Sequence, residues 1–101
     1  SNDNATEEDL LTELLIKLGV SLTTRIETET INDLIIWKVG DNLILAYLNE
    51  HAKPTLDQLR KIAEIEPAKL IVLEDAFQGD DELKTNLSQI CKTNKIELWT
   101  V

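Results

Sequence analysis

The sequence predicts a mixed α/β domain with a sheet of about five strands, and three features of its 101 residues support this fold class. The run Leu70 to Leu73 is short, unbroken and apolar, which is typical of a strand buried on both faces. An amphipathic helix follows Gly79 and leads into another strand pattern, which together indicate a parallel βαβ crossover. Residues 20–48 have the β-branched density of an antiparallel meander. The predicted element order is α-β-β-β-α-β-α-β.

The first predicted helix begins at Thr6, whose hydroxyl can cap the free amides of the first turn. Acidic residues follow directly, where they stabilise the positive end of the helix dipole. Gly19 provides the stop. One face carries a leucine stripe made of Leu10, Leu11, Leu14, Leu15 and Leu18. This stripe either covers a face of the domain's own sheet or docks against a parent protein or partner, and we expect the first.

Three antiparallel strands are expected after this helix. In order, the predicted segments are a strand through Leu22, Ile26 and Ile31, a turn at Asn32 and Asp33, a strand from Leu34 to Val39, a two-residue hairpin turn at Gly40 and Asp41, and a strand from Asn42 to Leu48. Trp37 and Tyr47 lie on the two strands of that hairpin. We expect both rings to pack on the sheet faces, with a binding platform as the alternative.

Two further helices are predicted in the second half of the chain. A capping box of Thr55 and Gln58 begins the first of them, and Pro67 prevents its continuation. Its apolar stripe consists of Leu56, Leu59, Ile62 and Ala63. The last helix begins with an acidic turn and ends at Asn94, and its apolar face consists of Leu83, Leu87, Ile90 and Cys91. Ile96, Leu98 and Val101 then form the final strand.

The chain is strongly acidic, with 10 basic and 19 acidic residues and a net charge of −9. Such a chain repels phosphates, so we expect no direct nucleic-acid binding and favour protein partners. No apolar run reaches membrane-spanning length, and the N-terminus has acids where a signal peptide needs bases. The single Cys91 lies on an apolar helix face, which indicates a buried, unreactive thiol in a reducing compartment. A cytoplasmic location without membrane contact is therefore predicted.

The chain contains no methionine, which favours a piece excised from a longer protein. Residues 1–5 are expected to be a tag remnant or flexible N-terminus, since Ser1 and Asn2 resemble the scar of tag cleavage. Residues 6–101 are expected to form a single globular domain, because this length supports one hydrophobic core.

One acidic cluster is the candidate for chemistry, and it consists of Glu74, Asp75, Asp80 and Asp81 with Lys84 nearby. Its oxygens could hold Mg²⁺, or Asp75 could accept a phosphoryl group. The favoured interpretation is structural: Asp80 or Asp81 caps the helix, and Lys84 pairs with a neighbouring acid. The sequence has no glycine-rich phosphate loop and no known triad or zinc motif, and His51 is expected in a solvated loop. We therefore predict no catalytic, cofactor-binding or metal-ligating residue.

Two long stretches carry a family resemblance: LLTELLIKLGVSLTTRIE, from Leu10 to Glu27, and LIVLEDAFQGDDELKTNLSQICKTNKIELWTV, from Leu70 to Val101. A leucine-rich helix ending in glycine, a Ser-Leu-Thr strand entry, a Gly-Asp hairpin, a (D/S)-x-F-x-x-D motif and a Lys-x-Asn helix follow one another. In this order the chain resembles the C-terminal tail domain of type III restriction-modification DNA methyltransferases, the Mod subunits. The last motifs fall on Asp75, Phe77, Asp80, Lys84 and Asn86, with Asp81 in the same turn. We call these six residues the motif turn, and expect it to be structural or a docking site.

The resemblance implies a parent enzyme that methylates adenine N6 in DNA with S-adenosylmethionine. The family's Asp-Pro-Pro-Tyr-type motif and Phe-x-Gly-x-Gly loop do not occur in this chain, so no catalytic or cofactor residue is carried over. The resemblance implies an assembly role for this chain, with the rest of the Mod subunit, a second Mod or the restriction (Res) subunit as partner. The alternatives are a small stand-alone acidic α/β binding or regulatory module, or a Mg-dependent phosphoryl-transfer or receiver-like domain that uses Asp75 and Asp80.

Overall fold

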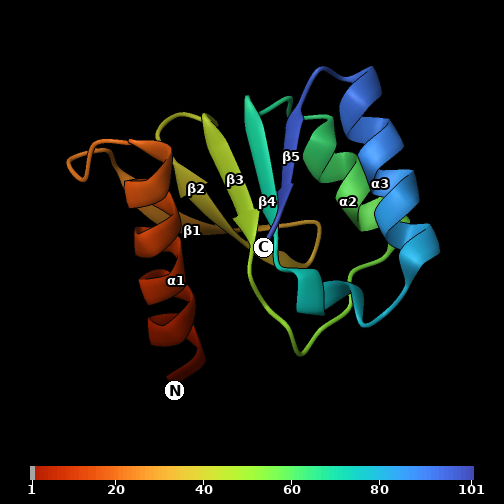
Figure 1. The fold of residues 1–101 in the computed structure, drawn as a ribbon, viewed down its shortest axis with the longest axis horizontal. Helices are drawn as coiled ribbons and strands as arrows, with labels where there is room; N and C mark the ends of the chain where they lie inside the picture. Colours follow the sequence, from red (N-terminus) through yellow and green to blue (C-terminus); the bar gives the residue numbers. More distant parts are fainter. Residues whose placement is uncertain (1) are drawn as a thin grey trace.

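The computed structural model describes residues 2–101, and these residues form the predicted mixed α/β fold (Figure 1). The elements are α1 (Asn2–Leu18), β1 (Ile26–Ile31), β2 (Leu34–Val39), β3 (Ile44–Tyr47), α2 (Leu56–Ala63), β4 (Lys69–Val72), the 3-10 helix η1 (Glu74–Phe77), α3 (Asp81–Thr93) and β5 (Glu97–Thr100). Apart from η1, this is the predicted order. Ser1, part of the expected tag remnant, lies outside the described residues.

The sheet has the strand order β1-β2-β3-β4-β5. The pairs β1–β2 and β2–β3 are antiparallel, whereas β3–β4 and β4–β5 are parallel. The expected meander and C-terminal crossover are therefore confirmed, and a second crossover runs through α2. Both crossovers step in the same direction across the sheet, and right-handed connections of this kind place their helices on the same face. Figure 1 shows α2 and α3 together on one side, with α1 on the other.

The interior strand β4, next to the edge strand β5, contributes to two hydrophobic cores. Leu70 and Val72 pack under α2 and α3, and Ile71 packs under α1, because successive side chains of a strand point to opposite faces. The relative exposure of all three is 0%. The prediction of a strand buried on both faces is confirmed, except that Leu73 follows the end of β4 and is half-buried.

The leucine stripe of α1 packs on the domain's own sheet, as expected. Leu11, Leu14 and Leu15 are buried there, and the flanking leucines of the stripe are partly buried. Trp37 and Tyr47 are buried on opposite faces, Trp37 with α1 and Tyr47 with the α2 and α3 layer. Their predicted role in sheet packing is confirmed.

The start of α1 differs from the prediction. The helix begins at Asn2, so Thr6 lies within it and is not the capping residue. Ala5 favours the extension, since alanine has the highest helix propensity. Asn2, Asp3 and Asn4 have low helix propensity and do not account for it.

The first strand is shorter than predicted because its expected entry forms a turn. The amide of Thr24 donates to the carbonyl of Ser21 over 3.0 Å, and the amide of Thr23 donates to the Ser21 hydroxyl over 3.2 Å. These local hydrogen bonds compete with a strand ladder. Leu22 consequently lies in a loop and is 63% exposed.

The first of the two hairpin connections is as predicted, and the second is longer. Asn32 and Asp33 form a two-residue turn with φ of 52° and 68°, the left-handed pair that a type I′ hairpin requires. The expected two-residue turn at Gly40 and Asp41 is instead a four-residue connection, because Val39 pairs with Ile44. The third strand is therefore shorter than Asn42 to Leu48.

The predicted start of α2 and the predicted end of α3 are confirmed, whereas α2 ends at Ala63, before Pro67. The amide of Gln58 donates to the Thr55 hydroxyl over 3.1 Å, and the amide of Thr55 donates to Gln58 Oε1 over 2.9 Å, which completes the capping box. Asn94 is the C-cap of α3. Within residues 2–101, no helix has the length and apolar character needed to cross a membrane.

We expect Val72→Asp to unfold the domain. The side chain has no exposed surface, so the substitution places an unpaired charge in an apolar layer at a cost of several kcal/mol. Urea unfolding followed by circular dichroism measures this loss, with Thr30→Asp on the exposed surface of β1 as the control. An unchanged midpoint for Val72→Asp would contradict the burial of β4 in the core.

Candidate functional site

The motif turn lies at the carboxyl end of β4, where the chain passes through η1 and then into α3. Gln78 and Gly79 have φ of 49° and 80°, and these left-handed conformations reverse the chain. The amide of Gln78 donates to the carbonyl of Asp75 over 3.2 Å and closes η1. Leu73, half-buried at the end of β4, fixes where this turn begins. The turn therefore starts directly after a strand that is buried on both faces.

Asp80 is the residue that caps α3. Its carboxylate accepts a hydrogen bond from the amide of Leu83 over 2.9 Å and forms an ion pair with Lys53 over 2.7 Å. The hydrogen bond from Lys53, followed by that from the Leu83 amide, lowers the pKa of Asp80 below its usual value. Asp81 is the first residue of α3 and is exposed. Of the two predicted capping residues, Asp80 has this role.

The other residues of the motif turn point in different directions. Phe77 is 2% exposed and belongs to the core under α2 and α3. Lys84 pairs with Glu74 over 2.6 Å, as predicted for a neighbouring acid. Asn86 and Asp80 line one surface hollow, and Asp75 lines another. The structure therefore does not gather the motif turn into one site.

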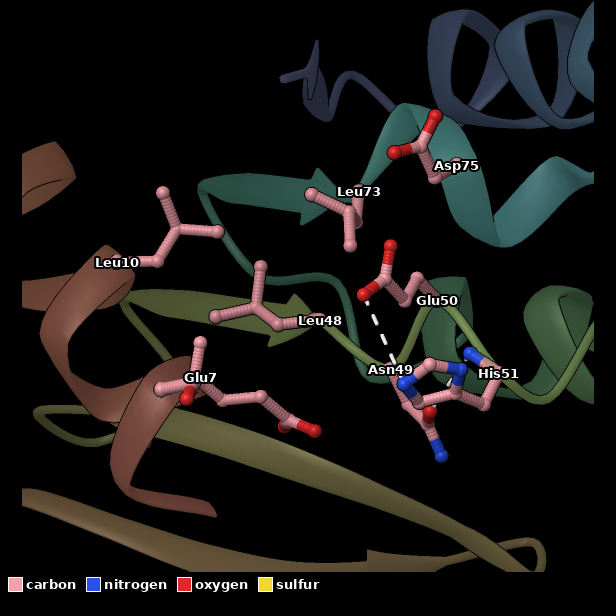
Figure 2. Close-up of a pocket in the computed structure, with 9 residues that line it drawn as sticks. Glu7, Leu10, Leu48, Asn49, Glu50, His51, Leu73 and Asp75 are labelled. Atoms are coloured by element: carbon pink, nitrogen blue, oxygen red, sulfur yellow. Dashed lines mark hydrogen bonds and ion pairs between the residues drawn. The ribbon is translucent and has the colours of Figure 1, made fainter. Parts of the chain in front are cut away.

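The hollow lined by Asp75 lies at the carboxyl ends of β3 and β4, where ligands collect in open α/β sheets (Figure 2). Its volume is about 370 Å³, and we call it the carboxyl-edge hollow. It is lined by Thr6, Glu7, Leu10, Leu48, Asn49, Glu50, His51, Leu73 and Asp75. Figure 2 shows Leu10, Leu48 and Leu73 on one side and the polar residues of the loop after β3 on the other. The hollow thus combines an apolar wall with an acidic rim.

Two of the acids on this rim, Glu7 and Glu50, already have a partner within the domain. Glu7 accepts a hydrogen bond from the Trp37 indole over 2.9 Å. Glu50 lies 3.6 Å from His51 Nε2, and the His51 side chain is 68% exposed, which confirms its predicted place in a solvated loop.

The pKa of the buried Tyr47 is raised above its usual value. Burial is the larger cause, and the negative charge of Glu7 is the smaller one.

Sequence reasoning identified Asp75 but missed Glu7 and Glu50 as its neighbours. Glu7 lies in α1 and Glu50 follows β3, so both are far from Asp75 along the chain. The available signal was that polar residues follow both β3 and β4, since parallel neighbouring strands bring their carboxyl ends to one edge. The pairing of β3 with β4 was not predicted.

The chemistry of the carboxyl-edge hollow favours a cation with an aliphatic stem. Three carboxylates, from Glu7, Glu50 and Asp75, give it negative charge, and leucines form its apolar wall. A lysine or arginine side chain uses both features, because its methylene groups pack on apolar surface while its charge stays near solvent. Within the described part of the chain, no group of three or more His, Cys, Asp or Glu residues has a metal-binding arrangement.

A comparison with protein-family profiles and with curated protein sequences finds no match to this chain. The interpretation of the site therefore depends on the contacts within the domain. Cys91 is consistent with the predicted unreactive thiol: it is buried, and desolvation raises its pKa to about 11.

We expect Asp80→Ala to lower the thermal midpoint by about 5 °C, as the loss of a helix cap does in a domain of this size. Asp81→Ala is the matched control and should have a smaller effect, because Asp81 does not cap α3. Differential scanning calorimetry measures both. Equal losses for the two variants would contradict the assignment of the cap.

Asp80→Asn separates the charge of Asp80 from its capping role, since asparagine is an equally good cap. The folded state lowers the pKa of Asp80, so its charge stabilises the domain above the unfolded pKa and loses this effect as pH falls through the folded value. The difference in thermal midpoint between the wild type and Asp80→Asn should be largest at neutral pH and shrink below about pH 4. A difference that is constant with pH would exclude the contribution of the charge.

Phe77→Ala should lower the free energy of unfolding by about 3 to 5 kcal/mol, because the ring is buried in the main core. Urea titration measures the change. Ile16→Ala, at a side chain that is 59% exposed, is the control and should cost much less. Equal costs for the two substitutions would mean that Phe77 is not a core residue.

Proposed function

We propose that this chain is a non-catalytic assembly domain of a type III restriction-modification Mod subunit. The parent enzyme in this proposal methylates adenine N6 in DNA in the cytoplasm, and S-adenosylmethionine binds to the parent and not to these residues. The support from the sequence is the order of motifs, from the leucine-rich helix to the Lys-x-Asn helix at Lys84 and Asn86. The proposed partners are the rest of the Mod subunit, a second Mod or the Res subunit.

The carboxyl-edge hollow is the observation that carries the proposal. Its rim contributes Glu7, Glu50 and Asp75, and its wall contributes one leucine of α1 and the leucines that directly follow β3 and β4. Such a surface repels the phosphates of nucleotides and DNA and attracts a basic side chain of a protein partner. A chain with a net charge of −9 strengthens this preference at long range.

The motif turn has a defined part in this proposal. Phe77 anchors η1 in the core, and Asp80 caps α3 and binds Lys53. These contacts hold η1 in place, and η1 presents Asp75 at the carboxyl-edge hollow. The turn is thus structural in most of its residues and supplies one exposed acid for docking.

The phosphoryl-transfer alternative needs Asp75 and Asp80 to act on one ligand. They line different hollows, and the carboxylate of Asp80 is occupied by Lys53 and by the amide of Leu83. The geometry therefore favours the assembly proposal over this alternative.

The test is binding of this chain, immobilised by its N-terminus, to Mod lacking its C-terminal domain and to Res, measured by biolayer interferometry. Glu50→Lys reverses a charge on the rim and should weaken the association about tenfold or more. Glu64→Lys makes the same charge change at the end of α2, outside the lining of the carboxyl-edge hollow, and should leave the affinity unchanged.

Two results would overturn the proposal. One is the failure of the chain to bind either Mod or Res, and the other is an equal loss of affinity in both charge-reversal variants.

Calorimetric titration of the chain with S-adenosylmethionine should show no saturable heat. Saturable binding at micromolar concentration would assign the cofactor to this domain instead.

A further inference from the structure

The last strand, β5, is an edge of the described sheet with unpaired backbone groups. The amide of Glu97 donates to the carbonyl of Ala68 over 3.1 Å, and the amide of Val101 donates to that of Val72 over 3.2 Å. Backbone groups of a strand alternate in direction from one residue to the next. The N–H and C=O groups of Leu98 and Thr100 therefore point away from β4, toward the open side of the sheet.

The opposite edge of the sheet, β1, has two acids within its length, whereas β5 has one, Glu97. Glu27 of β1 pairs with Arg25 over 3.1 Å, and Glu29 pairs with Lys38 over 3.5 Å. Charged side chains of this kind prevent edge-to-edge pairing. In β5, the sequence Leu98-Trp99-Thr100 has no charge. Glu97, the first residue of β5, pairs with Lys69 over 3.1 Å and accepts a hydrogen bond from the Trp99 indole over 2.9 Å.

We propose that β5 pairs antiparallel with β5 of a second copy of this chain. This inference deepens the proposed function. It rests on that function only for the identity of the joined proteins, which would be two Mod subunits. The outward backbone groups define the register, in which Leu98 lies opposite Thr100 of the second copy and Thr100 lies opposite Leu98. Four hydrogen bonds result, and the two sheets become one continuous sheet.

This register places the two Trp99 side chains opposite each other at the two-fold axis. They form the pair without mutual backbone hydrogen bonds, in which side chains approach most closely and aromatic pairs are stabilising. Trp99 lies on the α1 side of the sheet, where it is half-buried, and Lys69 Nζ lies 4.1 Å from the ring centroid. A second copy fits better than an unrelated strand, because it supplies the matching tryptophan by symmetry.

The charges near the axis permit this contact. Lys69 neutralises Glu97 in each copy, so no unpaired acid of β5 faces the other chain. The net charge of −9 opposes association at long range, but at physiological ionic strength exposed charges are screened beyond about 8 Å. Because β5 has only four residues, the interface is small and the dimer is a weak, concentration-dependent one.

The test is sedimentation velocity of the chain from about 1 µM to about 1 mM, the range in which a small interface associates. The wild type should shift from monomer to dimer. Thr100→Pro removes an outward N–H from each copy, and so two of the four intermolecular hydrogen bonds, and should weaken the dimer about tenfold or more. Proline at an outward edge position leaves the bonds to β4 intact.

Thr28→Pro is the matched control, because the outward groups of β1 alternate in the same way. The amide of Gly40 donates to the carbonyl of Arg25 over 2.8 Å. The backbone groups of Ile26, Thr28 and Thr30 therefore face the open side of β1. This variant should dimerise like the wild type. Amide hydrogen exchange gives a second measurement that needs no variant: the amides of Leu98 and Thr100 should become protected as the concentration rises, and that of Thr28 should not.

A wild type that remains monomeric at about 1 mM would overturn the inference, as would a dimer in which Thr28 and not Thr100 becomes protected. A chain that binds Mod or Res but stays monomeric would sink the β5 pairing and keep the proposed function. A chain that dimerises through β5 but binds neither subunit would overturn the proposed function and keep the β5 pairing.

Discussion

The burial of β4 on both faces is the constraint on which the rest of this domain depends. Leu70, Ile71 and Val72 have no exposed surface, and an apolar strand of this kind is stable only when both faces of the sheet are covered. The leucine stripe of α1 covers one face, and α2 with α3 covers the other. The parallel pairing of β4 with β3 and β5 follows, since each connection carries a helix back across the sheet.

The same arrangement determines where polar groups can gather. The carboxyl ends of parallel strands lie at one edge of the sheet. A polar segment follows each of two strands there, Asn49 to His51 after β3 and η1 after β4. At this edge the acids divide between two tasks. Asp80 satisfies the helix start and pairs with Lys53, while Asp75 stays exposed beside Glu7 and Glu50. One acidic turn thus stabilises the crossover and also shapes a surface.

The two edges of the sheet differ in a way that bears on association. Charged side chains occupy β1, which keeps its outward backbone groups from pairing with other strands. In β5, Glu97 is the one charged residue and pairs with Lys69, and the uncharged Leu98-Trp99-Thr100 leaves an aromatic ring beside the open backbone. Assembly through β5 and docking at the carboxyl-edge hollow would use different sides of β4, so both contacts can form in one complex.

Local chemistry in the sequence determined most of the fold. The β-branched run at β4, the capping box at Thr55 and Gln58, and the acidic start of α3 each specify an element through contacts within a few residues. Predictions failed where several local solutions have similar energies, as at Thr6, at Leu22 and in the loop from Gly40 to Leu43. Tertiary structure alone decided that β3 pairs with β4, and therefore that Glu7, Glu50 and Asp75 share one hollow. The physical reason is that these acids come from separate elements, whose proximity depends on how buried strands and helices pack and on no contact between neighbours in sequence.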